Sequence, residues 1–534
     1  MKKNLLSIEG VSSIILEILY ERGIKSEDEV QKFLNPDVSM LSNPFQICGM
    51  QQACELIEDT IRARKKIFIY SDGDVDGIAG AAIIANVFNS MNVAFDVKLT
   101  HRLENYEIEP EFVKKIEEMG YGLLITIDTG TTSKELIDYC EKTKFPLIII
   151  DHHRGSIEKD LHYTTIVNPS LNRGDGDFDI FTASGLVLKL AQSFLEVFPF
   201  FPRDIFYSCI ELGAIGTLND HGLLRGENRA IVKIGLNRFE NTGIPGIEKF
   251  KEHFYIPKNS DEIRIITHYL NPKLNTPGRF GKPELAFKIL TAGLDENIEP
   301  IFEEIKTFEK EKQRVMRNLL SVIKSKDTER LPIFLFENIP ASFSGTFAAK
   351  ISEKFQMPAL VAIRHGDLIQ GSARSFNRIN LYDFFNQIRD IFISFGGHRD
   401  AIGFKMKSSN MSELKKFWRE MKIEKPRISN EMKPIHMDFE NITIPFLKDL
   451  QLLKPFGYGN PPVFFTTSGV ECVKITRYQK NETVVWVKQN NCLFEAHFTG
   501  TFKMPSKPLS ICYSPVLHKS GDLFITWLDV IQAG

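Results

Sequence analysis

The sequence predicts an α/β protein with a parallel sheet in its first half, a second, smaller α/β domain, and a β-barrel at its C-terminal end. Three apolar runs, Lys66–Tyr70, Leu123–Ile127 and Pro146–Ile150, are separated by segments of helical spacing, the pattern of buried parallel strands joined by helices. Residues 295–326 carry one long amphipathic pattern. Roughly the last hundred residues alternate apolar and polar side chains, as the strands of small barrels do.

Size and composition narrow the class of protein. The chain of 534 residues is too long for one hydrophobic core, so several domains are expected. It lacks an uncharged apolar run of about 18 residues, and Glu9 interrupts the short apolar stretch near its start, so neither a membrane span nor a secretory signal is expected. Seven scattered cysteines without CxxC spacing argue against a zinc ribbon and favour the reducing cytoplasm. The net charge of −2 leaves nucleic-acid binding open.

The first half divides into a leader, residues 1–50, and a doubly wound domain, residues 51–294. In the leader, apolar spacing predicts a helix over Ser12–Glu21, and Ser26 followed by acidic residues predicts the start of another. In the domain, Ile205–Ile215 fits a buried helix or a strand. Helices are predicted at Gln51–Ala63, after Gly77, and at Glu111–Met119, Lys134–Thr143 and Thr182–Val197.

The second half begins with the amphipathic segment 295–326, which predicts one helix of about 30 residues and about 45 Å. This helix belongs either to a core or, as we prefer, to a connection between two lobes. Residues 327–425 form the smaller α/β domain, with strands at Ile333–Phe336 and Ala359–Ile363. A polar linker then leads to the barrel, residues 430–534.

Carboxylates and imidazoles gather where the three apolar runs end. The carboxyl ends of parallel strands lie at one edge of a sheet, where open α/β proteins bind ligands. Acidic groups that converge there would repel one another without cations, so one or two bound divalent metals are the simplest remedy. The residues are Asp72, Asp74 and Asp76 after the first run, Asp128 after the second, and Asp151, His152 and His153 after the third.

Each acidic stretch also has a simpler interpretation. Asp72 to Asp76 could form a solvated turn, although carboxylates at alternate extended positions can meet one metal pair. Their spacing overlaps the start of an EF-hand loop, but position 83 is Ile where that loop needs Glu. Alone, Asp128 and Asp220 each fit a turn or a helix cap.

The histidine pair is the sharper signal. Adjacent side chains point in different directions, so one of His152 and His153 could ligate a metal while the other faces a substrate. Asp151 would accept a hydrogen bond from an imidazole and fix its orientation.

In their order along the chain, these motifs resemble the RecJ family of the DHH phosphoesterase superfamily. The resemblance implies a DHH domain, a connecting helix, a DHHA1 domain and an oligonucleotide-binding (OB) barrel. It is carried by Arg22–Ile24, Phe33–Pro36, Asp72–Gly77, Thr126–Gly130, Asp151–His153, Gly216–Asp220, Leu274–Arg279, Gly371–Ser375, Phe395–His398 and Phe456–Pro461.

The resemblance implies an exonuclease that degrades single-stranded DNA from 5′ to 3′ in DNA repair and recombination. It also implies catalytic roles for Asp128 and His153, with His153 contacting the scissile phosphate. Two divalent cations, Mn²⁺ or Mg²⁺, would be held by Asp72, Asp74, Asp76, Asp128, His152 and Asp220.

Substrate binding needs groups outside the metal pair. Arginine offers a planar fork that suits phosphate oxygens, although a lone surface Arg is more often part of an ion pair. Glycine allows a close backbone approach. The candidates are Arg102, Arg279, Ser372, Arg374, Gly397 and His398.

The expected partners are single-stranded DNA and, by resemblance, a single-strand-binding protein and a helicase, with the chain itself a monomer. Some barrel aromatics could stack on bases, with the barrel core as the alternative for most of them. Three rival functions stay open: a DHH phosphodiesterase for short RNA or cyclic dinucleotides, a non-catalytic Cdc45-like scaffold, and a plain single-strand-binding protein. The aromatics are Phe464, Phe465, Trp486, Phe494 and Phe498.

Overall fold

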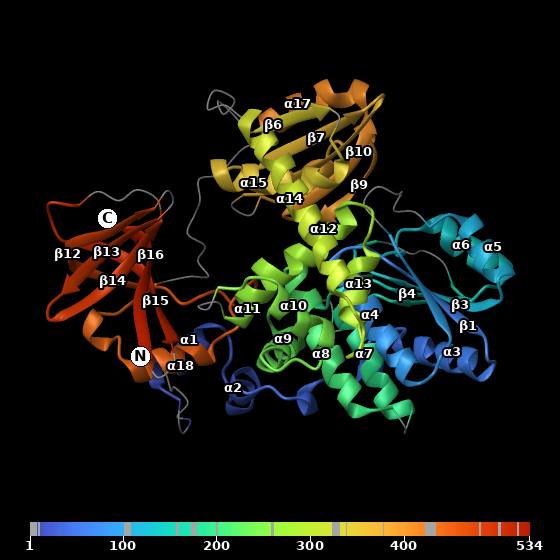
Figure 1. Cartoon of the computed structure of the whole chain (residues 1–534), viewed down its shortest axis with the longest axis horizontal. Helices are drawn as coiled ribbons and strands as arrows, with labels where there is room; N and C mark the ends of the chain where they lie inside the picture. The colour runs from blue at the N-terminus through green and yellow to red at the C-terminus, as the bar shows by residue number, and fades with distance from the viewer. Residues whose placement is uncertain are drawn as a thin grey trace.

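The computed structural model resolves three sheets with their surrounding helices (Figure 1). It describes Ile8 and residues 11–100, 108–155, 160–171, 178, 180–198, 201–257, 261–322, 332–337, 339–376, 379–421, 434–479, 482–499, 504–520 and 523–533. No helix within these ranges is long and apolar enough to cross a bilayer.

The first sheet is parallel throughout, in the order β2-β1-β3-β4-β5. The three predicted apolar runs form β1, β3 and β4, which are neighbours in this sheet, so their carboxyl ends lie side by side as expected. Every residue of β3 and β4 is buried, in keeping with helices on both faces. The strands are β1 (Lys66–Ser71), β2 (Phe95–Leu99), β3 (Tyr121–Ile127), β4 (Leu147–Ile150) and β5 (Thr164–Val167).

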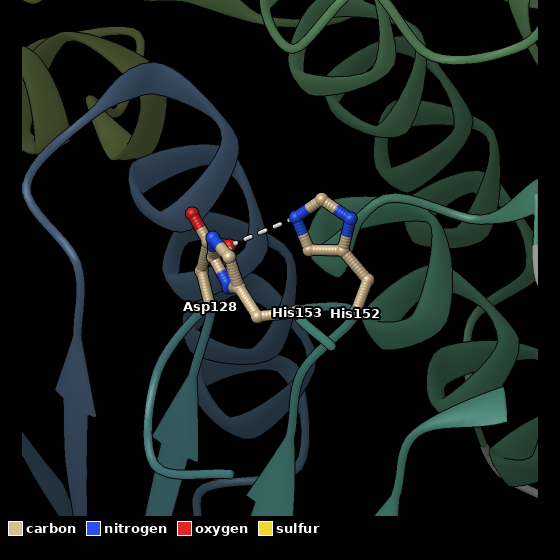
Figure 2. Close-up of side chains that lie close together, drawn as sticks. All are labelled: Asp128, His152 and His153. Carbon is tan, nitrogen blue, oxygen red and sulfur yellow. Dashed lines mark ion pairs between the residues drawn. The ribbon is translucent and has the colours of Figure 1, made fainter. Parts of the chain in front are cut away.

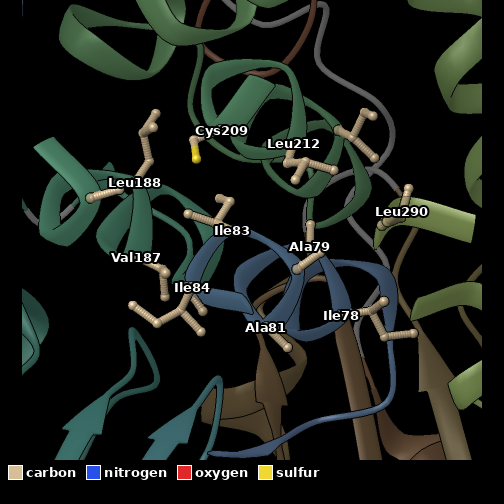
Figure 3. Close-up of a cluster of buried hydrophobic side chains, with 14 of the residues drawn as sticks. Ile78, Ala79, Ala81, Ile83, Ile84, Val187, Leu188, Cys209, Leu212 and Leu290 are labelled. Atoms are coloured by element: carbon tan, nitrogen blue, oxygen red, sulfur yellow. The ribbon is translucent and has the colours of Figure 1, made fainter. Parts of the chain in front are cut away.

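One face of this sheet carries the main core. There α4 packs against α7 and α8, as Figure 3 shows for Ile83, Val187 and Leu212. A Cβ on Gly80 would come within 2.8 Å of the Ile127 side chain, so small residues let α4 lie close to the sheet. The opposite face is covered by α5 and α6. The helices are α3 (Met50–Arg62), α4 (Val75–Ser90), α5 (Pro110–Glu118), α6 (Lys134–Thr143), α7 (Ala183–Val197) and α8 (Arg203–Asn219).

These bounds confirm the predicted helices to within a few residues, and Ile205–Ile215 proves to be helical as part of α8. Further helices complete the domain: α9 (Gly226–Phe239), α10 (Pro245–His253), α11 (Glu262–Arg264), a π-helical turn (Ile265–Leu270), α12 (Asn271–Arg279) and α13 (Glu284–Thr291).

The long helix α14 spans Glu299–Val322, which is 24 residues or about 36 Å. The prediction of a start at residue 295 was wrong, because the Asn297 side chain accepts a hydrogen bond from the Glu299 N–H and caps the helix there. Residues 323–326 of the predicted helix lie outside the described ranges. Near its start Phe302 belongs to the first core, and near its end Leu319 belongs to the core of the next lobe. The helix therefore connects two lobes, which is the interpretation that we preferred over a helix within a single core.

The second lobe has a mixed sheet in the order β6-β7-β8-β10-β9, in which only β6 and β7 run parallel. The sequence indicates β6 and β7 but not the other three strands, where glycines interrupt the apolar pattern. The elements are β6 (Ile333–Glu337), α15 (Ser344–Phe355), β7 (Ala359–His365), β8 (Leu368–Arg374), α16 (Leu381–Asn386), β9 (Phe392–His398), β10 (Ala401–Lys407) and α17 (Met411–Glu420).

The C-terminal strands form the predicted barrel, which a pairing of β12 with β15 closes. Its core also contains α1 and α2 from the other end of the chain, where Ser26 and Glu29 form a capping box at the predicted helix start. Figure 1 shows these helices beside the barrel. The elements are α1 (Ser13–Glu21), α2 (Glu27–Leu34), β11 (Ile435–His436), α18 (Ile444–Leu452), β12 (Phe465–Gln479), β13 (Glu482–Gln489), β14 (Cys492–Thr499), β15 (Leu509–Ser520) and β16 (Leu523–Ala533).

Candidate metal centre and active site

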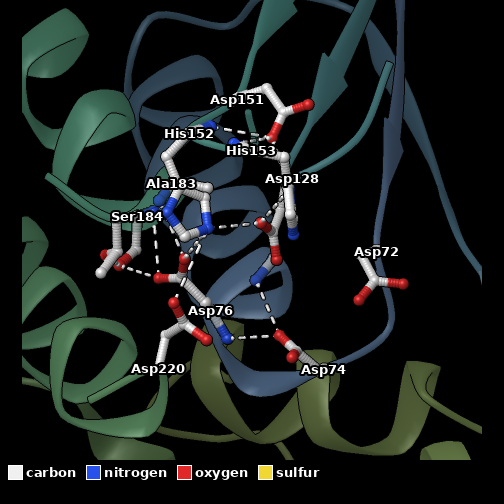
Figure 4. A network of polar contacts seen from close by, with 12 residues as sticks. Asp72, Asp74, Asp76, Asp128, Asp151, His152, His153, Ala183, Ser184 and Asp220 are labelled. Carbon is white, nitrogen blue, oxygen red and sulfur yellow. Dashed lines mark hydrogen bonds and ion pairs between the residues drawn. The ribbon is translucent and has the colours of Figure 1, made fainter. Parts of the chain in front are cut away.

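Acidic and imidazole side chains converge beyond the carboxyl ends of β1, β3 and β4 (Figure 4). Asp220 joins them from the last turn of α8. The structure thus brings together all six residues expected to bind metal: Asp72, Asp74, Asp76, Asp128, His152 and Asp220.

Asp128 is held in an unfavourable state. Its backbone is left-handed at φ +60°, a conformation that L-residues rarely adopt, and its side chain is buried. Within the described parts of the chain its Oδ1 accepts no hydrogen bond. Burial, with the charges of Asp76 and Asp74, raises the pKa of Asp128 well above its ordinary value. A bound cation would relieve both the repulsion and the missing contact.

The His152 ring turns toward the Asp128 carboxylate (Figure 2). Its Nε2 lies 3.3 Å from Asp128 Oδ1, 3.7 Å from Asp220 Oδ2 and 4.0 Å from Asp76 Oδ2. Burial alone would lower the pKa of His152, but the charges of Asp220 and Asp76 outweigh burial and raise it. One nitrogen surrounded by three carboxylates is the donor set of a divalent-metal site.

His153 is oriented by Asp151, as the sequence suggested. Its Nδ1 lies 2.7 Å from Asp151 Oδ1, which also accepts the N–H groups of His152 and His153. Burial would raise the pKa of Asp151 and lower that of His153. The hydrogen bond and the opposite charges outweigh burial, so the pKa of Asp151 is lowered and that of His153 is raised to about 9. Nε2 lies on the other side of the His153 ring from this contact.

The other carboxylates are fixed by neighbouring backbone and hydroxyl groups. Asp76 accepts hydrogen bonds from the N–H groups of Ala183 (2.8 Å) and Ser184 (3.2 Å) at the start of α7, where the helix dipole favours negative charge. Asp74 caps α4 by accepting the Asp76 N–H at 2.9 Å, and Asp72 accepts the Thr100 hydroxyl at 2.8 Å. These contacts leave the carboxylates aimed at one small space.

Sequence reasoning missed several residues that support the centre. Asn168 donates from Nδ2 to the His153 carbonyl at 2.9 Å and to the Thr131 hydroxyl at 2.9 Å. Asn275 accepts the Val75 N–H at 3.1 Å and donates to Asn219, beside Asp220, at 2.7 Å. In the sequence, Asn168 is marked only by the proline that follows it. Asn275 is marked only by the stretch Leu274–Arg279, which resembles the RecJ family.

Three substrate-binding candidates lie where the second lobe meets the first domain. Arg279, at the end of α12, donates to the Ser342 carbonyl, and the Ser342 hydroxyl donates back to the Arg279 carbonyl at 3.0 Å. Ser372 pairs its hydroxyl with that of Ser344 at 3.1 Å. The positive charge of Arg374, at the end of β8, acts on His221, which directly follows Asp220.

Of the other three candidates, only Gly397 lies wholly within the described part of the structure. Gly397 lies in the β9–β10 hairpin with φ +134°, and a Cβ there would come within 2.2 Å of the Ala401 carbonyl oxygen. The hairpin itself therefore requires this glycine. Arg102 and the side chain of His398 lie outside the described part of the structure.

The donor set fits a divalent cation. One candidate group, Asp72, Asp74 and Asp128, offers carboxylate oxygens that all lie within 4.8 Å of one another. A second, Asp128, His152 and His153, adds imidazole nitrogens within the same distance. Carboxylates suit Mn²⁺ and Mg²⁺, imidazole is a common ligand of first-row metals, and the set contains no thiolate.

An open parallel sheet with this Asp-His-His centre, joined to a second α/β lobe, defines a DHH-type protein. Residues 66–217 match the DHH family N-terminal domain, and residues 331–422 match the DHHA1 domain. Residues 435–519 match the RecJ OB domain, so the barrel is of the OB type. The chain therefore combines a DHH domain, a DHHA1 domain and an OB domain of the RecJ type.

Relatives extend this match over most of the chain. The single-stranded-DNA-specific exonuclease RecJ of Bacillus subtilis is 25% identical over 90% of this chain and 62% of its own length. RecJ of Thermus thermophilus is 25% identical over 84% of this chain and 65% of its own length. The chain thus spans less than two thirds of either relative. RecJ of Escherichia coli is 25% identical over 76% of this chain and 75% of its own length.

The fold agrees with solved structures. The crystal structure of RecJ from Thermus thermophilus in complex with Mn²⁺ matches 98% of this chain and 76% of its own, with a TM-score of 0.81 and 19% identity. The corresponding Mg²⁺ complex covers 98% of this chain and 74% of its own, with a TM-score of 0.74 and 18% identity. The predicted order of parallel-sheet domain, connecting helix, smaller α/β lobe and OB barrel is therefore confirmed.

Proposed function

We propose that this protein is a metal-dependent exonuclease that hydrolyses single-stranded DNA from 5′ to 3′ in DNA repair and recombination. The observation that carries the proposal is the convergence of five carboxylates and an imidazole on one edge of the sheet, with Asp128 buried, strained and lacking a hydrogen bond at Oδ1 within the described ranges. The three matched domains support the reaction class, and the RecJ relatives are named for single-stranded DNA.

Asp72, Asp74, Asp76, Asp128, His152 and Asp220 would hold two divalent cations, Mn²⁺ or Mg²⁺. When bound, such a pair activates water and neutralises charge on the phosphate during in-line displacement. The chain itself supplies the fixed geometry: α7 holds Asp76, Asp74 caps α4, and the left-handed turn presents Asp128. Such preorganisation lowers the cost of reaching the transition state.

His153 would contact a non-bridging oxygen of the scissile phosphate through Nε2, because Asp151 already holds Nδ1. A His153 that stays protonated near neutral pH, as its pKa of about 9 indicates, stabilises developing negative charge there. Ser372 and Arg374 would bind phosphates of the strand across the junction between the lobes, near His221. We also propose that the strand is contacted by the remaining candidates, which are Arg279, Gly397, Arg102 and His398.

The barrel would track the incoming strand. Phe465 and Phe498 are buried in the barrel and are unsuited to stacking, whereas Trp486 is half-buried on the outward side of β13, between the fully buried Val485 and Val487. Phe494 packs edge-on against the buried Phe439. Trp486 and Phe464, which is also half-buried, are therefore the better of the five candidates for base stacking. We further propose a cytoplasmic monomer that is assisted by a helicase and a single-strand-binding protein.

A degradation time course tests the activity. Oligonucleotides blocked at the 5′ or 3′ end are incubated with Mn²⁺, Mg²⁺ or a chelator. We expect shortening of the 3′-blocked strand only, with no products in the chelator and little cleavage of duplex. Cleavage restricted to dinucleotides, short RNA or cyclic dinucleotides would favour a different DHH phosphodiesterase. Binding of the strand without any metal-dependent cleavage would favour a scaffold or a binding protein.

Binding of Mn²⁺ is expected to weaken as the pH falls below about 7. In the absence of a cation, burial raises the pKa of Asp220 to about 7, with Asp76 adding to and His152 opposing the rise, and the pKa of Asp128 is raised too. Ligand carboxylates must lose their protons to bind metal, so protons compete below this pH. The dissociation constant should rise about tenfold per pH unit for each proton displaced.

Isothermal titration calorimetry in two buffers of different ionisation heat measures this proton release. Release of at least one proton near pH 6.5 is the expected result, because the pKa values of Asp128 and His152 are raised as well as that of Asp220. An affinity that stays constant between about pH 6 and pH 8, with no proton released, would contradict the assignment of Asp220 and Asp128 as ligands.

A further inference from the structure

The segment Leu453–Pro461 joins α18 to the barrel strand β12 and packs against the catalytic domain; we name it the docking segment. It closes on itself through Asn460, which is buried and donates from Nδ2 to the carbonyls of Leu453 (2.9 Å) and Pro455 (2.7 Å). Arg22, just after α1, donates to the Asn460 side chain and to the Pro461 carbonyl at 2.7 Å. The segment is therefore a fixed part of the unit that contains the barrel, α1, α2 and α18.

Arg229 on α9 is the main contact from the catalytic domain to the docking segment. Its guanidinium donates to the carbonyls of Lys454 (2.9 Å) and Pro455 (3.2 Å), and also to that of Phe33 (3.3 Å), whose ring centroid lies 3.6 Å from the guanidinium carbon. One turn further along α9, Lys233 donates to the carbonyls of Leu34 (2.6 Å) and Leu452 (3.1 Å).

These two cations are unusual because neither has an acidic partner among the described residues, although Arg229 is buried and Lys233 is half-buried. Arg229 is only 2% exposed, and burial lowers the pKa of both groups, to about 9 for Arg229 and about 8 for Lys233. Among the residues that the structure describes, backbone carbonyls are their only hydrogen-bond acceptors. Carbonyl oxygens compensate a buried cation only while the segment that bears them stays in place. The charges thus tie one unit to the other.

The same docking segment also braces the loop that follows Asp220. Leu224 donates its N–H to the Tyr458 carbonyl at 2.7 Å, and Arg225 donates from Nε to the Gly459 carbonyl at 3.1 Å. Gly459 has φ +85°, and a Cβ there would come within 2.5 Å of the Leu223 side chain. Leu223 and Leu224 lie three and four residues after Asp220, so the docking segment contacts the loop that begins at this carboxylate.

We infer that Arg229 is a positioning residue that couples the docking of the barrel to the assembly of the metal centre. It holds the docking segment against α9, and the docking segment in turn holds the Asp220 loop. The same contacts fix the barrel in one position relative to the cluster. The inference rests on the proposed role of Asp220 as a metal ligand; Arg229 itself touches neither the cluster nor a substrate.

The test uses the variant Arg229→Met in the full chain, in which an uncharged side chain of similar volume replaces the arginine. Binding of Mn²⁺ is measured by isothermal titration calorimetry, and the radius of gyration by small-angle X-ray scattering. We expect the dissociation constant for Mn²⁺ to rise about tenfold, the lower end of the effect seen when groups that support metal ligands are removed. We also expect a larger radius of gyration, because the barrel unit is released. At saturating Mn²⁺, KM for a long single strand should rise while kcat on a dinucleotide changes less than about twofold.

Two further variants keep the test falsifiable. Lys233→Met removes two carbonyl contacts and leaves Arg229 in place, so it should change the dissociation constant for Mn²⁺ and the radius of gyration less. This variant replaces Arg229→Met in the test if Arg229→Met does not fold. Arg229→Lys should give an intermediate affinity, because an ammonium can still donate to some of the carbonyls. The matched control is Lys249→Met, since Lys249 donates to the carbonyls of Leu294 (2.9 Å) and Glu296 (2.7 Å) within the catalytic domain.

The inference is overturned if folded Arg229→Met binds Mn²⁺ as tightly as the wild type, whatever the radius of gyration. If Arg229→Met does not fold, an unchanged affinity in Lys233→Met overturns it. Failure of the wild-type protein to bind Mn²⁺ is a different result, which overturns the proposed metal centre instead. An equal loss of affinity in Lys249→Met would also overturn the inference, because the effect would then be general destabilisation.

Discussion

Replacing Asp128 with Asn is expected to abolish nuclease activity and, in metal-free protein, to raise thermal stability. The carboxylate is buried beside Asp76 and Asp74, so its pKa is raised and its ionised form is disfavoured in the folded state. A carboxyl with a raised folded pKa contributes stability that is complete at low pH and is lost as the pH rises through that pKa. At pH 7.5 the neutral amide should therefore raise the melting temperature of the catalytic domain by about 2–5 °C.

With added Mn²⁺, the wild-type protein should instead melt at a higher temperature than Asp128→Asn. The wild-type protein gains stability from the bound cation, whereas Asp128→Asn loses a ligand and most of that gain. Differential scanning calorimetry with Mn²⁺ and with chelator measures both effects, and activity on a labelled oligonucleotide should fall at least about 10³-fold. Asp59→Asn, the same chemical change at an exposed position of α3, is the control. If Asp128→Asn melts below the wild type in the presence of chelator, the Asp128 carboxylate is not destabilised by its acidic neighbours as we describe.

His153→Gln is expected to separate binding of metal from catalysis. Gln cannot offer a positive charge to the phosphate, but the Asp128, His152 and Asp220 atoms that face one another are unaltered. We expect kcat to fall about 10²–10³-fold, with the affinity for Mn²⁺ changed by less than about threefold. In the metal-free wild-type protein, burial lowers the pKa of His153 but Asp151 raises it to about 9, and an NMR titration of the imidazole measures this value.

Single-turnover kinetics, together with calorimetric titration of Mn²⁺, measure kcat and the affinity. His162→Gln, at an exposed position, is the control. Loss of Mn²⁺ binding in His153→Gln would show that this histidine is itself an essential ligand. A kcat that stays near that of wild type would remove its contact with the phosphate.

The sheet edge was predictable because strand ends are local features of the sequence. The runs that became β1, β3 and β4 are apolar over their whole length, and their Asp and His residues follow directly. The groups that hold these residues were not predictable. Asp76 is fixed by the start of α7, which lies 107 positions away. The left-handed backbone of Asp128 is a conformation that few non-glycine residues adopt, and no local pattern in the sequence predicts it.

Arg279 makes a contact that its motif did not predict, while its role in binding phosphate stays a proposal. Its motif marked a phosphate-binding side chain, but a guanidinium is also a good donor to carbonyls, and here it reaches Ser342 in the next lobe. In the smaller lobe β8, β9 and β10 escaped prediction for a related reason. Cross-strand neighbours stabilise them, and a window along one strand does not contain those neighbours.

The sharing of one core by α1, α2 and the barrel has a consequence for biosynthesis. Arg22 and Asn460, which meet in the finished molecule, are 438 positions apart. Helices α1 and α2 therefore wait with their apolar sides uncovered until the barrel strands are translated. A chaperone that shields nascent chains would be needed longest at this end, and a barrel expressed by itself would show the bare surface that α1 and α2 normally occupy.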